Sequence, residues 1–315
     1  VYLLIVTASI PFIALYNGGA AVFRAMGNSE VSMKVSLLMN AINVSGNAIL
    51  IYGFHCGTEG VAIPTLVSRF VAAFIIIKLL LKDKWSLHLE RTFRFNPDWS
   101  MIKKILSVGI PNGLENSMFQ LGKVLVLSLV STFGTYAIAA NAVSNVITLF
   151  SILPGQAICL AVTTVIARCV GAGDYEQAKY YNKKLILLTH IGMAITIFIV
   201  FITLPFILKV YNLSEAAEAT RHIIWFHGFC AILIWAESFT LPATFRACGD
   251  AKACMIISTV SMWIFRVGAS YILGKNLGLG VFGVWVAMII DWAFRSLLFG
   301  IRYFSGKWKK HALVS

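Results

Sequence analysis

The stretch KLILLTHIGMAITIFIVFITLPFIL, residues 184–208, is almost entirely apolar. A helix that crosses the hydrocarbon core of a membrane needs about 20 mostly apolar residues. Counting this stretch, nine candidate spans lie at 1–23, 33–53, 60–81, 105–131, 136–167, 184–208, 222–245, 254–274 and 280–303. Their apolar runs are continuous, whereas the strands of a membrane barrel alternate. The sequence therefore predicts an all-α polytopic membrane protein.

The composition agrees with this prediction. Of the 315 residues 59% are apolar and 12% are charged, and the mean hydropathy is +0.82. Soluble domains average roughly 45–50% apolar and about 25% charged residues. A disordered chain, a nucleic-acid module and an ordinary cytosolic enzyme are therefore excluded. The net charge of +13 is better explained by loop charges that orient the chain in the membrane than by a nucleic-acid partner.

The basic residues are distributed unevenly between the two sides of the predicted membrane. Of the 26 Lys and Arg residues, 20 fall in one set of alternate connections. The other set holds Lys209, Arg221 and Lys275. Cytoplasmic loops carry the excess of Lys and Arg, so the C-terminus is expected in the cytoplasm and Val1 on the outer side.

An internal repeat relates the two ends of the chain. Phe23-Arg24-Ala-Met-Gly27-Asn28 recurs as Phe245-Arg-Ala-Cys-Gly-Asp250, an offset of 222 residues. The first three spans thus correspond to the last three, and the even number of spans between them predicts a parallel repeat. The three central spans have no partner upstream. We therefore expect a missing N-terminal stretch of about 120 residues, and a parent of twelve helices in two six-helix lobes.

This count predicts the domain organisation. Residues 1–82 would form the second half of the N-terminal lobe and 83–104 a cytoplasmic linker between the lobes. Residues 105–303 would form the C-terminal lobe of six helices, and 304–315 a cytoplasmic tail.

One predicted span carries a polar stripe. Asn112, Glu115, Asn116, Phe119 and Lys123 are spaced at i, i+3, i+4, i+7 and i+11, which places them on one helix face. Ionisable groups at membrane depth are costly and usually functional. A carboxylate on this stripe can bind a cation such as Na⁺ or change its protonation. The alternative is a structural bridge between the Glu and the Lys of the stripe.

Four other spans carry polar residues at membrane depth. Glu237 shares a face with Thr240 and Thr244, and either lines a cavity or makes a structural hydrogen bond. Asp291 and Arg295 are spaced as an i,i+4 ion pair. Two further polar stripes either hold helices together or line a cavity; they include Asn43 and Asn47 in one span and Asn141 and Asn145 in another.

No catalytic motif accompanies these residues. The sequence holds no HExxH, GxxxxGK[ST] or GxSxG pattern. We therefore expect a protein that is not an enzyme and has no cofactor.

Several motifs together resemble the multidrug and toxic compound extrusion (MATE) family. They are Gly109-Ile-Pro-Asn-Gly-Leu-Glu115 with Phe119-Gln-Leu-Gly122, the twin Phe-Arg-Ala-x-Gly turns, and Asn43-x-x-x-Asn47 followed by Gly57-x-x-Gly60-x-Ala62-x-x-Thr65. The resemblance covers all nine spans, as family helices four to twelve.

The resemblance implies two lobes arranged as a V around a central cavity. It also implies an antiporter of the bacterial inner membrane that exports cationic or amphiphilic drugs, driven by Na⁺ or H⁺. By this resemblance the coupling ion binds at Glu115 and Glu237, and a second polar site matches Asn43, Asn47 and Thr65. The expected partners are small organic cations or amphiphilic drugs and the lipid bilayer, with the protein acting as a monomer.

A flippase for lipid-linked oligosaccharides is the alternative of similar architecture. Such a protein needs cationic cavity residues for pyrophosphate, and Arg69, Lys123 and Arg266 are the candidates. The position of Glu115 on the same stripe as Lys123 opposes this alternative.

Overall fold

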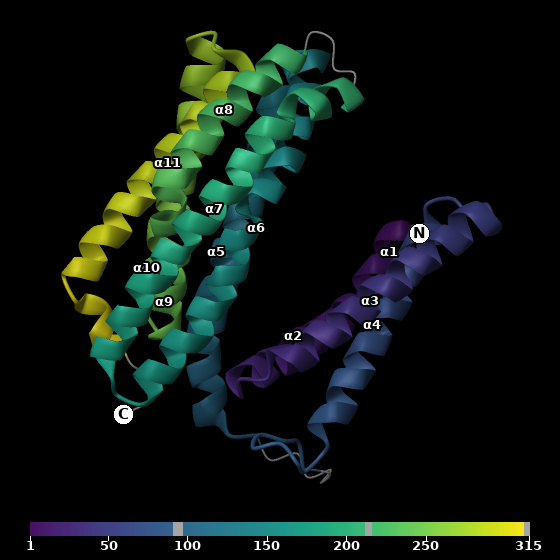
Figure 1. Cartoon of the computed structure of the whole chain (residues 1–315), viewed down its shortest axis with the longest axis vertical. Helices are drawn as coiled ribbons and strands as arrows, with labels where there is room; N and C mark the ends of the chain where they lie inside the picture. The colour runs from purple at the N-terminus through teal and green to yellow at the C-terminus, as the bar shows by residue number, and fades with distance from the viewer. Residues whose placement is uncertain (91–96, 212–215, 312–315) are drawn as a thin grey trace. The chain divides into compact units, whose positions relative to one another are not determined.

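The computed structural model describes residues 1–90, 97–211 and 216–311. Within these ranges the secondary structure is helical and holds no strand, which confirms the all-α prediction. The chain divides into two compact units, Val1–Asn96 and Pro97–Ser315 (Figure 1). The boundary falls inside the predicted linker 83–104, although the next helix already begins at Trp99.

The Val1–Asn96 unit is a bundle of three membrane-length helices (Figure 1). Its elements are α1 (Tyr2–Ala8), α2 (Ile10–Ala25), α3 (Ser29–Ala48), the π-helical turn Ile49–Gly53 and α4 (Glu59–Leu80). Helix α4 packs against α1, α2 and α3. The core of this bundle includes Phe23, Ala72 and Ile76, all at most 1% exposed.

The Pro97–Ser315 unit is a larger bundle (Figure 1). Its helices are α5 (Trp99–Ser131), α6 (Thr135–Gly171), α7 (Tyr175–Tyr211), α8 (Ala216–Trp235), α9 (Leu241–Ala247), α10 (Ala251–Ser261) and α11 (Gly280–Phe304). Three π-helical stretches, Ala236–Thr240, Met262–Gly268 and Tyr271–Asn276, and a 3₁₀ turn, Lys307–His311, complete it.

Eight helical segments in the described ranges are long and apolar enough to cross a membrane. They match eight of the nine predicted spans. The ninth predicted span, 105–131, lies in α5, which has 33 residues. Its polar stripe makes it less apolar than the other eight.

Two local expectations meet different outcomes. Gly171-Ala-Gly-Asp174 is typical of a turn in which the aspartate caps a following amphipathic surface helix. The cap is present, because the Asp174 carboxylate accepts a hydrogen bond from the N–H of Gln177 at 2.8 Å. The segment that follows is continuous with the membrane helix up to Tyr211 rather than a separate surface helix. In α5, Pro111 and its neighbouring glycines favour a loosened helix with exposed carbonyl groups, but α5 continues through Pro111 as one helix.

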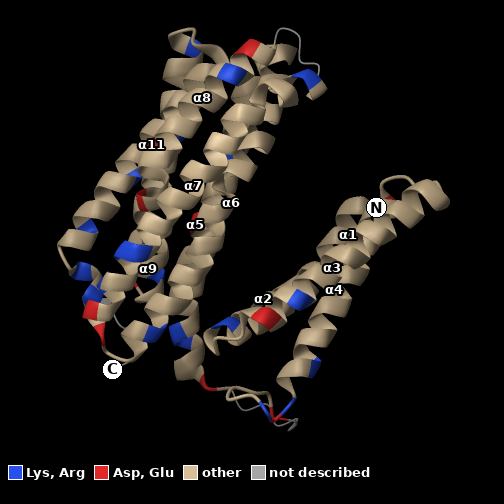
Figure 2. Cartoon of the chain, viewed as in Figure 1, with Lys and Arg blue, Asp and Glu red and all other residues tan. Residues whose placement is uncertain are grey.

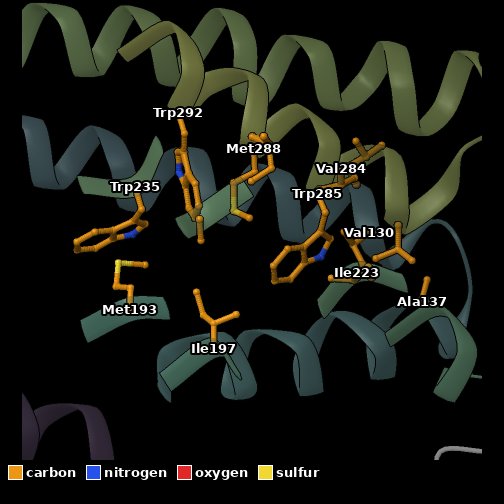
Figure 3. Packing of buried hydrophobic residues seen from close by; sticks show 14 residues of the cluster. Val130, Ala137, Met193, Ile197, Ile223, Trp235, Val284, Trp285, Met288 and Trp292 are labelled. Carbon is orange, nitrogen blue, oxygen red and sulfur yellow. The ribbon is translucent and has the colours of Figure 1, made fainter. Parts of the chain in front are cut away.

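The core of the larger unit is rich in tryptophan. Trp235, Trp285 and Trp292 pack with Met193 and Ile197, and all five are at most 4% exposed (Figure 3). Between membrane helices such packing stabilises the bundle through van der Waals contacts, because lipid tails are as apolar as these side chains. The cluster joins α7, α8 and α11 and so fixes the helices that surround the cavity described below.

Charged residues are concentrated at the helix ends. In the Pro97–Ser315 unit, most Lys and Arg residues gather at the end of the bundle that carries the C-terminus (Figure 2). This distribution within the unit is the one from which the sequence predicts membrane orientation.

Candidate functional site

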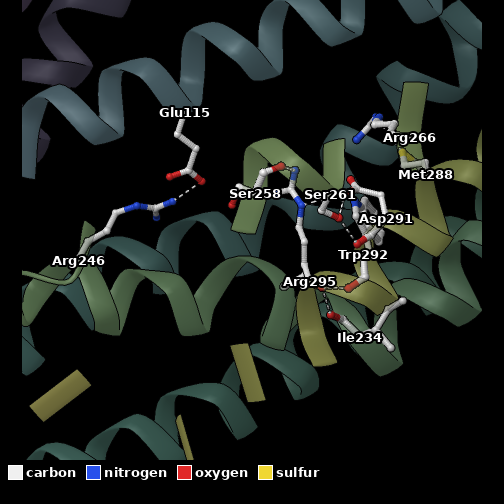
Figure 4. Close-up of polar contacts among 11 residues, drawn as sticks. Glu115, Ile234, Arg246, Ser258, Ser261, Arg266, Met288, Asp291, Trp292 and Arg295 are labelled. Carbon is white, nitrogen blue, oxygen red and sulfur yellow. Dashed lines mark hydrogen bonds and ion pairs between the residues drawn. The ribbon is translucent and has the colours of Figure 1, made fainter. Parts of the chain in front are cut away.

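Glu115 is held by an arginine from another helix. Its carboxylate Oε1 lies 2.8 Å from Nη2 of Arg246, which follows α8 and the π turn on α9 (Figure 4). The Glu115 side chain is 11% exposed, and its second oxygen, Oε2, is buried without a hydrogen-bond partner in the described residues. The partner is therefore Arg246 and not Lys123, the partner that the structural alternative proposed.

Glu237 lies in the π-helical turn Ala236–Thr240. Pro242 follows and has no N–H to donate to the carbonyl oxygen of Ser238, so the regular helical ladder is interrupted here. The Glu237 Oε1 atom lies 2.9 Å from Nε2 of His190 on α7. As with Glu115, its Oε2 is buried without a partner among the described residues.

The hydrogen bonds of His190 determine how its ring is protonated. Its Nδ1 lies 2.6 Å from the backbone carbonyl oxygen of Ile232. A carbonyl oxygen only accepts, so Nδ1 carries a hydrogen. The contact between Nε2 and Glu237 then needs one more proton, either on the imidazole or on the carboxyl group. The His190–Glu237 pair therefore holds one exchangeable proton.

A third carboxylate is fully enclosed. Asp291 on α11 is 0% exposed and accepts hydrogen bonds from Nε of Arg295, at 3.0 Å, and from the hydroxyl of Ser261 (Figure 4). Arg295 also donates to the carbonyl oxygen of Ser258. The ion pair predicted from the i,i+4 spacing is present within α11. The hydrogen bonds with Ser261 and Ser258 tie α11 to α10.

The Pro97–Ser315 unit contains a cavity of about 460 Å³. This volume falls within the range of small-molecule sites. Its apolar lining includes Phe119, Phe239, Trp235, Trp285, Trp292 and Met288. Its polar lining is Lys123, Asn141, Asn145, Thr148, Gln156, His227 and Arg266.

Some of the residues selected from the sequence lie on this cavity and others do not. Lys123, Asn141 and Asn145 line it. Glu115 and Glu237 are absent from its lining, and each is paired with its own partner. The structure thus does not bring the two glutamates into one cavity of this unit.

The remaining amides make local contacts. The Asn116 side chain donates to the carbonyl oxygen of Asn112 at 2.8 Å, within α5. The Asn145 side chain donates to the carbonyl oxygen of Asn141 in the same way at 2.7 Å. The side-chain oxygen of Asn141 accepts from the Trp285 indole at 3.2 Å, which ties α6 to α11 at the cavity wall.

A separate polar cluster lies in the Val1–Asn96 unit. The Asn43 amide donates to the Thr65 hydroxyl at 3.1 Å, and the Asn47 amide donates to the side-chain oxygen of Asn43 at 3.2 Å. The Asn47 side-chain oxygen is buried without a partner among the residues described. The structure therefore brings together the three residues that the resemblance grouped. In the same unit Arg69 donates to the Ser9 hydroxyl at 2.6 Å.

Two residues of the site, Arg246 and His190, are not among the candidates that the sequence predicts. Arg246 belongs to the repeated Phe-Arg-Ala turn, which follows the end of the predicted span 222–245. His190 interrupts the apolar stretch 184–208, and an ionisable side chain in the middle of a span is itself a signal of function. The described residues hold no group of three His, Cys, Asp or Glu side chains that could bind a metal ion.

Comparison with known proteins places this site in a family context. A family model described as MatE matches residues 111–272, a range that includes Glu115, Glu237 and Arg246. A probable multidrug resistance protein NorM of Thermotoga maritima is 29% identical over 311 residues, which cover 94% of this chain and 64% of that protein. The uncharacterized transporter YisQ of Bacillus subtilis is 27% identical over 312 residues, 96% of this chain and 68% of that protein.

The fold is also shared with solved structures. A structure described as the outward-facing conformation of a multidrug resistance MATE family transporter of the MOP superfamily covers 98% of this chain and 70% of that chain. The TM-score is 0.89 and the identity 20%, so the likeness shows the fold. This chain spans 64% of the length of the Thermotoga relative. The relatives are named as transporters or resistance proteins and not as enzymes, as the sequence predicted.

Proposed function

The chain belongs to the MatE family, and we propose that the complete protein is a cation-coupled antiporter that exports cationic or amphiphilic small molecules. In this proposal it acts as a monomer in the cell inner membrane, with its C-terminus in the cytoplasm. The basic residues at the C-terminal end of the larger bundle support that orientation.

The observation that carries the proposal is the environment of two carboxylates at membrane depth, each of which pairs with a basic side chain. Glu115 and Glu237 each have one oxygen held by a basic side chain and one buried oxygen without a partner in the described part of the chain. A buried oxygen left in this state is costly. A bound cation or a proton would satisfy it, so the residues fit a coupling ion.

We assign H⁺ as the coupling ion at Glu237. The His190–Glu237 pair already requires one proton for its 2.9 Å contact, so a proton is the ion that fits this pair. Protonation of Glu115 would remove the charge that attracts Arg246 and so weaken the link between α5 and α9. A coupling ion drives transport only when it binds two conformations with different affinity. The strength of the His190–Glu237 and Glu115–Arg246 pairs depends on protonation, so these pairs can differ between the two conformations.

Transport by the complete protein in liposomes tests this assignment. A pH gradient is imposed with equal Na⁺ on both sides of the liposome membrane. We expect export of ethidium, an organic cation, or of the anion 5-dimethylaminonaphthalene-1-sulfonate. Glu237→Gln and His190→Gln should reduce gradient-driven export to the level of protein-free liposomes. Glu218→Gln changes an exposed acid on α8 and should leave it unchanged. Exchange of dye without a gradient should persist in all variants, since it needs a folded carrier but no coupling proton.

Two outcomes would contradict parts of the proposal. Export driven by a Na⁺ gradient at equal pH, and not by a pH gradient, would replace H⁺ by Na⁺ as the coupling ion. If neither gradient drives export of either dye, the antiporter itself is rejected.

One observation favours the flippase as a second candidate. Lys123 and Arg266 line one cavity, and Glu115, which opposed that candidate in the sequence, is bound to Arg246 elsewhere. Movement of a fluorescent polyprenyl-pyrophosphate sugar between bilayer leaflets, without an ion gradient, would identify this activity.

A further inference from the structure

The charged residues of the cavity in the Pro97–Ser315 unit are all basic. Lys123 from α5 and Arg266 from the π-helical stretch Met262–Gly268 line it. Within the described residues, neither an aspartate nor a glutamate is part of the lining. Two like charges in a site with apolar walls repel one another and are poorly solvated. This arrangement favours a ligand that supplies the missing negative charge.

The contacts of the two cations leave them available to a ligand. The Lys123 ammonium and the Arg266 guanidinium lie over the ring of Phe119, 5.5 and 5.2 Å from its centre. Arg266 also donates through Nη2 to the sulfur of Met288 at 3.0 Å, and a thioether is a weak acceptor. No carboxylate forms an ion pair with either cation in the described part of the chain.

The nearest acid does not cancel this charge. Asp291 attracts Arg266 electrostatically, but its Oδ1 is already bound to Arg295 and Ser261 (Figure 4). Its Oδ2 accepts no hydrogen bond from the described residues. Arg295 itself lies 5.4 Å from the centre of the Phe119 ring. Three cations therefore surround one aromatic ring, with one carboxylate between them, and the region stays positive.

The walls of the cavity suit a flat apolar group. Trp235, Trp285 and Trp292 line it together with Phe119 and Phe239. Three of these rings belong to the buried cluster of Figure 3, so their positions are fixed by packing. Aromatic faces of this kind stack on planar ligands.

We infer that this cavity binds amphiphilic anions: molecules with an aromatic or apolar body and a carboxylate, sulfonate or phosphate group. The body lies against the tryptophans, and the anionic group lies between Lys123 and Arg266, where Arg can donate two parallel hydrogen bonds. The inference rests on the proposed export function and narrows its substrate class for this site, because the lining offers no acid to an organic cation.

Three naphthalene dyes of one ring system test the charge preference. The complete purified protein in a maltoside detergent is titrated with the anion 5-dimethylaminonaphthalene-1-sulfonate, the neutral sulfonamide and the cationic aminoethyl sulfonamide. Energy transfer from tryptophan reports binding, since three tryptophans line the cavity. The anion should bind about tenfold or more tightly than the other two, the effect of one charged hydrogen bond. Equal affinity for all three dyes, or a preference for the cation, would overturn the inference.

Variants locate the binding site. Lys123 is exposed to the cavity, so Lys123→Gln and Lys123→Glu should fold. The first should weaken anion binding about tenfold and leave the neutral dye within about twofold. The second should reverse the preference toward the cationic dye. Arg266→Gln should weaken anion binding as Lys123→Gln does. Lys252 is an exposed lysine outside the lining, so Lys252→Gln should leave the affinity for all three dyes unchanged. Unaltered anion binding in Lys123→Glu would reject the site.

A competition arm distinguishes two sources of the anion. In nanodiscs, phosphatidylglycerol that displaces the anionic dye, where phosphatidylcholine does not, would identify a lipid phosphate as the occupant. Displacement by soluble aromatic sulfonates alone would identify a small-molecule substrate. Binding is measured without an ion gradient, so its failure is distinct from failure of coupled export.

Discussion

The first and last thirds of the chain carry the same repeat, and their turns have the same backbone. Gly27 has φ +83° and Gly249 has φ +87°, a left-handed conformation that glycine adopts without strain. In each copy the residue after the glycine donates to the carbonyl oxygen of the buried phenylalanine at 2.9 Å, the helix-ending arrangement expected of glycine. A π-helical stretch begins at Ile49 in one copy and at Tyr271 in the other, at the same offset of 222 residues.

The side chains on the helix faces differ between the copies. At the position of Asn43 in the first copy, the second has Phe265. From Gly60-Val61, which match Gly283-Val284, the offset becomes 223 residues, so the position of Thr65 is occupied by Met288. Conversely, the positions of Ser68 and Ala72 in the first copy are occupied by Asp291 and Arg295 in the second. The repeat therefore preserves the residues that shape the backbone, whereas the charged residues of each copy differ with the helices that pack against it.

The largest expected effect concerns the charged pair that only the second copy has. Asp291→Asn would leave Arg295, which is 3% exposed, without its counter-ion. Loss of one partner of a buried pair costs about 3–5 kcal/mol. The variant should therefore unfold at a clearly lower temperature, as measured by tryptophan fluorescence in detergent.

The first copy supplies the control for this experiment. Asp291→Ser combined with Arg295→Ala installs the residues of the first copy, Ser68 and Ala72. Because Arg295 is removed together with its counter-ion, the double variant should be more stable than Asp291→Asn. A double variant that is less stable would show that the pair contributes more than the cost of its burial.

A smaller effect should separate the two arginines of the repeated turn. Arg246→Gln removes the 2.8 Å ion pair with Glu115 and should cost about 1.5–3 kcal/mol. Arg24 makes no ion pair among the residues described, so Arg24→Gln should change the free energy of unfolding by less than about 0.5 kcal/mol. Thermal unfolding of the two variants checks the difference, and equal losses would show that both arginines act through their packing.

The smallest effect is expected at a helix start outside the spans. The N–H groups of Met101 and Ser100 donate to the Asp98 carboxylate at the start of α5, and these bonds lower the pKa of Asp98. Its stabilising contribution is complete above the unfolded pKa of about 4. It is lost as the pH falls through the lower pKa of the folded state.

Asp98→Ala should therefore lower the thermal midpoint near neutral pH and have no effect in strong acid. Asn28 begins α3 in the first copy without a side-chain cap bond, so Asn28→Ala should show no such pH dependence. A difference between Asp98→Ala and the parent that is the same at every pH would contradict this account.

Features that depend on neighbours along the chain can be predicted from the residues alone. Span length and hydropathy predicted the helices, because each helix in a membrane must satisfy its own backbone hydrogen bonds. The i,i+4 spacing predicted the Asp291–Arg295 pair, and the residue types predicted the glycine turns and the Asp174 cap.

Contacts between residues far apart in the chain could not be predicted in this way. Arg246 reaches Glu115 across 131 residues, and His190 reaches Glu237 across 47. Lys123 and Arg266 likewise share a cavity although they lie on different helices. The reason is physical: helical periodicity fixes the face on which a side chain lies, but the packing of whole helices decides which face it meets.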